Sequence, residues 1–173
     1  MESNLAILTK LSTSIDSMNE KIGLAVSWLT TAMVLIVCLD VVTRYFFKSS
    51  SVAIQELQWH LFSIVFLLAA AYTLKHDRHV RVDVFYHSMT DKNRARVDFF
   101  GHLFFLIPFC LLIIWSSKDF VVNSFMISET SGDPGGLPFR YILKACIPLG
   151  FFLVMLQSLS QAIKSFLKMR GEK

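Results

Sequence analysis

The sequence predicts an all-α integral membrane protein with four transmembrane helices, both termini in the cytoplasm and an additional amphipathic helix at the N-terminus. Hydrophobic residues make up 54% of the 173 residues and charged residues only 17%, whereas a soluble domain carries about 25%. The charges are also segregated, because four long stretches contain almost none. We therefore expect the whole chain, 1–173, to form a single membrane domain without a soluble catalytic domain.

The clearest span covers residues 54–74. Glu56 opens a run with no Asp, Glu, Lys or Arg before Lys75. At about 1.5 Å per residue, those roughly 18 residues cover about 27 Å, close to the hydrocarbon thickness of a bilayer. A cationic cluster, KHDRHVR at residues 75–81, then ends the run. Because such clusters are retained in the cytoplasm, this helix is predicted to run from outside to inside.

The distribution of Lys and Arg predicts the same orientation for the whole chain. With four spans, twelve of the 17 Lys and Arg residues fall in segments expected inside and five in segments expected outside. The five outside cations are Arg44, Lys48, Lys118, Arg140 and Lys144.

Residues 1–21 are predicted to form an amphipathic helix. Its apolar positions, spaced three and four residues apart, are Leu8, Leu11, Ile15, Met18 and Ile22. Polar residues, among them Asp16 and Asn19, occupy the other side. The segment is too polar to span a membrane, so we expect it to lie in the cytoplasmic interface or on a partner. A short surface helix without a further role is the alternative.

The first span is expected over residues 22–47 and carries a pair of opposite charges near its outer end. Asp40 and Arg44 are one helical turn apart in the favourable order of acid before base. Glu56 follows the short outside turn, so a helical hairpin places it at a depth similar to that of Arg44. We predict that Arg44 pairs with Asp40, with Glu56 or with both. The pair either steadies the hairpin or belongs to a surface for another chain.

Glu56 shares one face of the second span with His60 and Ser63, at positions i, i+4 and i+7. The cytoplasmic loop over residues 75–93 follows. Val80, Val82 and Val84 alternate with other residues there, which suggests a short extended or interface-lying piece. The loop is expected to set orientation and contact lipid head groups, or to dock a partner subunit.

The second half of the chain supplies two further spans. The third covers residues 94–120, with Pro108 expected to kink it, and the helix could continue to about residue 125. An outside loop, 121–137, contains the richest turn signals in the chain. The fourth span, 138–166, begins at Pro138, a good first-turn residue, and a cytoplasmic tail follows at 167–173.

No arrangement of residues predicts an enzyme. The three cysteines lie in apolar stretches without a C-x-x-C spacing and are interpreted as small buried hydrophobes. His60 and His102 lie within spans, and a haem held between two histidines would make the chain a membrane anchor subunit of a redox enzyme. The two side chains are expected to differ in height by roughly 18 Å in a core about 30 Å thick. One haem iron cannot take both, so we expect no cofactor and no bound metal.

Seven short motifs occur in order along the chain. They are DVVTRY at 40–45, EL at 56–57, AAAY at 69–72, HVRVD at 79–83, LP at 137–138, RY at 140–141 and IPLG at 147–150. In this order and on a four-span topology, they resemble the small permease subunit, the DctQ-type subunit, of tripartite ATP-independent periplasmic (TRAP) transporters.

This resemblance implies a multi-pass protein of a bacterial inner membrane that carries no substrate itself. It implies a separate large permease subunit that moves organic acids, such as sialic acids or C4-dicarboxylates, together with sodium. It also implies a periplasmic substrate-binding protein, which the small subunit would help to dock. Arg44, Glu56, Pro138 and Arg140 would then lie on the outer face. Arg81 and Asp83 would belong to the cytoplasmic rim.

Overall fold

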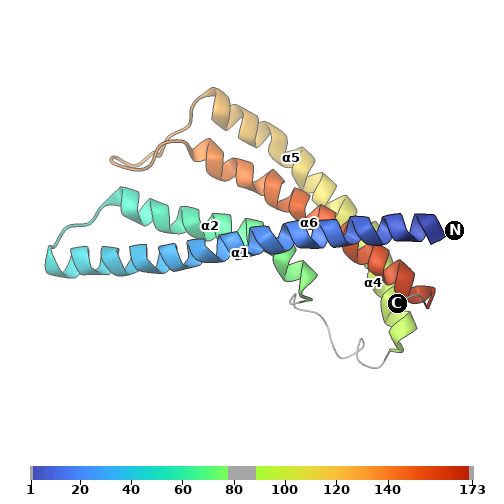
Figure 1. Ribbon diagram of the computed structural model, residues 1–173. Coiled ribbons are helices and arrows are strands. Elements are labelled where there is room, and N and C mark those ends of the chain that lie inside the picture. Colours follow the sequence, from blue (N-terminus) through green and yellow to red (C-terminus); the bar gives the residue numbers. More distant parts are fainter. Residues whose placement is uncertain (1, 78–88, 172–173) are drawn as a thin grey trace.

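The chain folds into a bundle of long helices in the computed structural model, which describes residues 2–77 and 89–171 (Figure 1). The elements are α1 (Glu2–Phe46), α2 (Val52–Lys75), α4 (Asp91–Gly101), the π-helical segment η1 (His102–Leu106), α5 (Ile107–Met126) and α6 (Arg140–Met169). No strand occurs among the described residues. Four helices are long and apolar enough to cross a membrane, with α4, η1 and α5 joined into one of them. The predicted four-span, all-α fold is confirmed.

Helix α6 is the centre of the bundle, because it packs against α1, α2, α4, η1 and α5. The segments 47–51 and 127–139 lie at one end of the molecule, on the left in Figure 1, and both termini lie at the other. We call these the loop end and the terminal end. Ion pairs and hydrogen bonds cluster at both ends.

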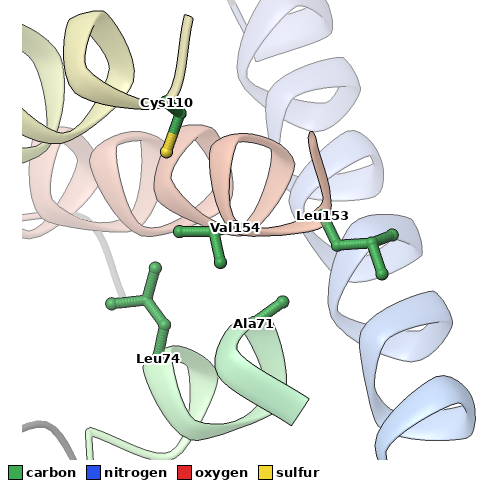
Figure 2. Close-up of a cluster of buried hydrophobic side chains, with 5 residues drawn as sticks. All are labelled: Ala71, Leu74, Cys110, Leu153 and Val154. Carbon is green, nitrogen blue, oxygen red and sulfur yellow. The ribbon is translucent and has the colours of Figure 1, made fainter. Parts of the chain in front are cut away.

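The apolar core is small and lies where three helices meet. It consists of Ala71 and Leu74 from α2, Cys110 from α5, and Leu153 and Val154 from α6 (Figure 2). Most large apolar side chains point outward instead: Phe105 and Trp115 on the third span are 76% and 83% exposed. Apolar surface of this kind suits contact with lipid, where helices associate by close packing rather than by hydrophobic burial.

Two glycines allow that close packing around α2. A Cβ atom at Gly150 of α6 would lie 2.7 Å from the carbonyl oxygen of Leu67. One at Gly23 of α1 would overlap the ring of Tyr72. Small residues at such crossings let helix backbones approach one another in membranes. Gly150 therefore holds α6 against α2, and Gly23 holds α1 against the same helix.

The prediction of a separate N-terminal helix is wrong in one respect. Residues 2–21 are helical, but α1 continues through them into the first span and runs the length of the molecule (Figure 1). At about 1.5 Å per residue its 45 residues extend about 67 Å, more than twice a bilayer core. No glycine or proline occurs before Gly23 to interrupt the helix. The N-terminal half of α1 is therefore an extension of the first span.

The buried face of this extension also differs from the predicted one. Asn19, expected on the polar side, is 1% exposed and packs toward α6, as does Ser12, which is 3% exposed. Ile15 is buried as well, whereas Leu11 of the predicted apolar stripe is 45% exposed. A polar seam against another helix has replaced the expected apolar contact with lipid.

The prolines act differently in the two later spans. Before Pro108, the helix contains the π-helical turn η1. Such turns occur where the regular helical hydrogen bonds are interrupted. Pro138 lies outside α6, which begins at Arg140, so its predicted place in the first turn is wrong. Phe139 adopts a left-handed conformation, with φ at 63°, between the loop and the helix.

Candidate functional site

Four charge-free segments cross the middle of the bundle, and ion pairs lie just beyond their ends. The segments are residues 22–39, 57–74, 99–117 and 145–163. Each measures about 27 Å along a helix, which matches one hydrocarbon core. The charged residues that flank them pair at both ends of the molecule, so the bundle consists of an apolar slab between two polar layers.

The polar layer at the loop end is organised around Glu56, which is only 4% exposed. Its Oε1 accepts hydrogen bonds from Ser131 Oγ at 2.5 Å and from Arg140 Nη2 at 3.0 Å. Its Oε2 accepts one from the backbone N–H of Leu137 at 2.6 Å. A single carboxylate thus ties α2 to the 127–139 loop and to the first residue of α6.

The loop is shaped to fit this carboxylate. Ser131 N–H donates to the Leu137 carbonyl at 3.0 Å, which closes the loop around Gly136. A Cβ atom at Gly136 would overlap the Ser131 side chain and lie 2.8 Å from Glu56 Oε2. Only glycine leaves room for the carboxylate at this position.

A second ion pair holds the start of the same loop. Lys144 of α6 pairs with Glu129, and its Nζ lies 4.0 Å from the centre of the Phe120 ring. The hydrogen bond from the Lys144 ammonium lowers the pKa of the Glu129 carboxyl below its ordinary value. Arg140 N–H donates to the Glu129 carbonyl at 2.9 Å. The loop is therefore fixed at both of its ends.

Arg44 pairs with Asp40 and not with Glu56. The Arg44–Asp40 pair lies within α1, at positions i and i+4, as one of the predicted arrangements requires. Asp40 is 4% exposed, whereas the Arg44 side chain is 50% exposed. Glu56 takes Arg140 from the other half of the chain, so the two predicted acids belong to separate groups.

The terminal end is tied by Glu20 of α1. Its Oε2 accepts hydrogen bonds from Lys75 Nζ at 2.6 Å and from His76 Nε2 at 2.9 Å. The Lys75 carbonyl in turn accepts a hydrogen bond from Gln161 of α6 at 3.3 Å. Three helices, α1, α2 and α6, therefore meet in one hydrogen-bonded group at this end.

A longer polar seam joins the extension of α1 to α6, with Asp16 at its centre. Asp16 Oδ1 accepts hydrogen bonds from Gln157 Nε2 at 2.9 Å and from Ser160 Oγ at 2.8 Å. Its Oδ2 pairs with Lys164. The seam continues to either side through Ser12, whose Oγ lies 2.8 Å from Ser160 Oγ, and Asn19, which donates to Gln157 at 2.8 Å.

This seam was not predicted from the sequence, although a signal for it is present there. Gln157, Ser158, Ser160 and Gln161 form an unusually polar run, QSLSQ, inside the last charge-free segment. Polar side chains within a span are costly unless they face a polar partner. The spacing of Ser12, Asp16 and Asn19 on α1 matches that run and could have indicated the contact.

The two histidines lie in different parts of the bundle. His60, in the loop-end half of α2, places Nδ1 2.6 Å from the Glu56 carbonyl oxygen. His102 begins η1 in the half toward the terminal end, and its Nδ1 lies 3.2 Å from Ser158 Oγ. The two rings therefore lie toward opposite ends of the bundle, each beside different neighbours. Among the described residues, no cluster of three potential metal ligands occurs.

The remaining predicted residues fall outside this network or outside the described ranges. Pro138 lies in the loop between Leu137 and α6. Arg81 and Asp83, and the alternating valines around them, fall within residues 78–88, outside the described residues.

An apolar groove runs over α6 between α2 and the third span. Two adjoining cavities of about 520 Å³ and 450 Å³ share Phe66 and Leu67 as lining residues. Asp98 and His102 lie along one cavity, and Arg140, Lys144 and Glu129 along the other. The described residues between those polar groups are mainly apolar. The arrangement suits helix packing or lipid contact rather than movement of a charged solute.

Comparison with known families gives a match over most of the chain. The model of the DctQ component of tripartite ATP-independent periplasmic transporters matches residues 33–168. Glu56 and its partners Ser131, Leu137 and Arg140, together called the Glu56 group, all lie in the matched range. The α6 side of the polar seam lies in it too, but Asp16 does not. No individual curated protein matches the chain significantly.

Proposed function

The chain belongs to the DctQ family, the small membrane subunits of TRAP transporters, and on that premise we propose that it braces the large permease subunit without carrying substrate itself. The family match bears out the resemblance of the short motifs and identifies an inner-membrane transporter component. Such components work in a tripartite complex with a large permease and a substrate-binding protein. The family is one of transporter components rather than enzymes.

One observation carries the bracing role: the bundle is tied at both ends and apolar between them. Glu56 with Arg140 closes the loop end, and Asp16 with Lys164 closes the terminal end. Secondary transporters usually keep ionisable groups near the midplane, and the charge-free segments contain no Asp, Glu, Lys or Arg, while His60 and His102 lie toward opposite ends of the bundle. A rigid, laterally apolar bundle suits a static support for a moving partner.

We propose further that the transporter is sodium-coupled and takes up organic acids of the sialic acid or C4-dicarboxylate type. This part rests on the family alone. The contacts that select a substrate belong to the large permease and the binding protein.

For the topology, we propose that both termini face the cytoplasm and that the loop end faces the periplasm. The twelve-to-five distribution of Lys and Arg supports this orientation. The 127–139 loop would then offer a surface to the binding protein. Ser131 and Leu137 anchor that loop through Glu56, while Asp133 and Gly135 at its tip stay exposed.

Reconstituted uptake tests the proposal. Proteoliposomes that contain the large permease, with and without this chain, would be supplied with the loaded binding protein and an inward sodium gradient. We expect uptake only when both membrane subunits are present, and loss of uptake when the gradient is abolished. Equal uptake without this chain would contradict the bracing role, and sodium-independent uptake would contradict the coupling.

A further inference from the structure

A small cationic pocket opens at the loop end of the α1–α2 hairpin, separate from the Glu56 group. Its volume is about 300 Å³, and its lining consists of Arg44, Lys48, Ser49, Ser50 and Gln55. None of these described lining residues is acidic. Two cations, two hydroxyls and an amide thus surround one cavity. Together they offer hydrogen-bond donors and positive charge to an anion.

The positive charge of this pocket is only partly neutralised. Asp40, one helical turn earlier on α1, pairs with Arg44 Nη2, and half of the Arg44 side chain remains exposed. Lys48 forms no salt bridge with any residue that the structure describes. Counting Asp40, the group holds two positive charges against one negative charge.

The first turn of α2 adds to the same potential. Ser51 occupies the N-cap position without a side-chain capping bond, and the first turn contains no acidic residue. Gln55 lines the pocket from that end of the helix. The free N–H groups and the positive end of a 24-residue helix therefore lie close to Arg44 and Lys48.

The residues around the pocket are of the kinds found at the level of lipid head groups. Tyr45, Phe46 and Phe47 stand between Arg44 and Lys48 in the sequence and are 76%, 81% and 73% exposed, the pattern of an aromatic belt at a membrane surface. One turn deeper on α1, Val41 and Val42 are exposed and apolar. A molecule seated here would meet cations at its head and apolar side chains along its tail.

We propose that this pocket binds the phosphodiester of a membrane phospholipid in the leaflet at the loop end. The Arg44 guanidinium and the Lys48 ammonium pair with the phosphate oxygens. Because the lining offers no carboxylate to an ammonium group, the pocket prefers phosphatidylglycerol to phosphatidylethanolamine. The assignment goes beyond the bracing role and does not depend on the substrate of the transporter.

Native mass spectrometry of the full-length chain tests this proposal. The protein in mild detergent would be titrated with phosphatidylglycerol and, separately, with phosphatidylethanolamine of the same acyl chains. We expect preferential retention of phosphatidylglycerol, weakened about fivefold in Lys48→Gln, the effect of one juxtamembrane cation. Lys118→Gln removes another exposed cation, on α5, and should leave retention unchanged.

Arg44→Lys provides a second variant that keeps a partner for Asp40. It should weaken phosphatidylglycerol retention by removing the forked donor, without unfolding the protein. Equal retention of the two lipids by the wild type, or unchanged retention in Lys48→Gln, would overturn the proposal in favour of non-specific surrounding lipid. Displacement of phosphatidylglycerol by millimolar inorganic phosphate would overturn it in favour of a free-phosphate site.

Discussion

Glu56 and Arg140 lie 84 residues apart in the sequence and form a salt bridge of 3.0 Å at one end of the bundle. The bridge joins the two helical hairpins of the protein. Because the same carboxylate also binds Ser131 and the Leu137 N–H, it couples the hairpins to the shape of the 127–139 loop.

Glu56→Gln should release that loop. The amide keeps the size of the side chain but removes the charge that Arg140 and two other donors share, and hydrogen bonds to a charged group are stronger than those to a neutral one. We expect faster hydrogen exchange and faster proteolysis within residues 127–139, with a lower thermal midpoint. Asp133→Asn, a change at an exposed acid of the same loop, serves as the control. Identical exchange in wild type and Glu56→Gln would contradict the role given to this carboxylate.

Gly150→Val should separate α6 from α2. The added Cβ would lie 2.7 Å from the Leu67 carbonyl oxygen, and such overpacking costs about 1–3 kcal/mol. Thermal unfolding in detergent measures the loss. Gly101→Ala is the matched control, because a Cβ there meets nothing within 4 Å and alanine favours the helix. A stable Gly150→Val protein would show that the close approach of the two helices is not required.

Asp16→Ala should detach the extension of α1 from α6. The change removes the partner of Lys164 and leaves Gln157 and Ser160 without their shared acceptor, and uncompensated buried polar groups are costly. Hydrogen exchange should rise in residues 5–20 and stay unchanged in residues 24–46, which remain within the membrane. Ser17→Ala, on the exposed side of α1, should have little effect. Protection of residues 5–20 in Asp16→Ala would contradict the seam.

The Glu129–Lys144 pair predicts a pH dependence with a definite sign. The pKa of Glu129 is lowered in the folded protein by the Lys144 ammonium. Ionisation of this carboxyl is therefore more favourable in the folded state than in the unfolded chain, and it stabilises the fold. This stabilisation is fully present above the ordinary carboxyl pKa of 4.5 and is lost as the pH falls through the lowered value. The thermal midpoints of wild type and Glu129→Gln should therefore differ at pH 7 and converge at lower pH. A constant difference down to pH 3 would contradict this account.

The sequence predicts the spans well because their signal is local. Each charge-free segment is long enough to cross a bilayer, and the flanking charges bound it regardless of how the helices pack. The Arg44–Asp40 pair is local in the same sense, since four residues on one helix determine it. The continuity of α1 could also have been predicted from the sequence, because no helix-breaking residue separates the extension from the span.

Contacts between helices are harder to predict, because they depend on the rotation of each helix about its axis. Arg44 and Arg140 are both near Glu56 in depth, and only packing determines that Arg140 forms the bridge. The partners of Asp16 lie 141 to 148 residues away. From the sequence alone, Asp16 is one polar residue among several on a helix face that is expected to contact water.

The most direct test of the bracing role is affinity purification of the tagged full-length chain from its native membrane in mild detergent. We predict that a large multi-span permease of the TRAP type co-purifies with it in a fixed ratio. Recovery of a flavin or iron–sulfur enzyme instead, with a haem absorption band that depends on His60 or His102, would contradict the bracing role and favour a redox anchor.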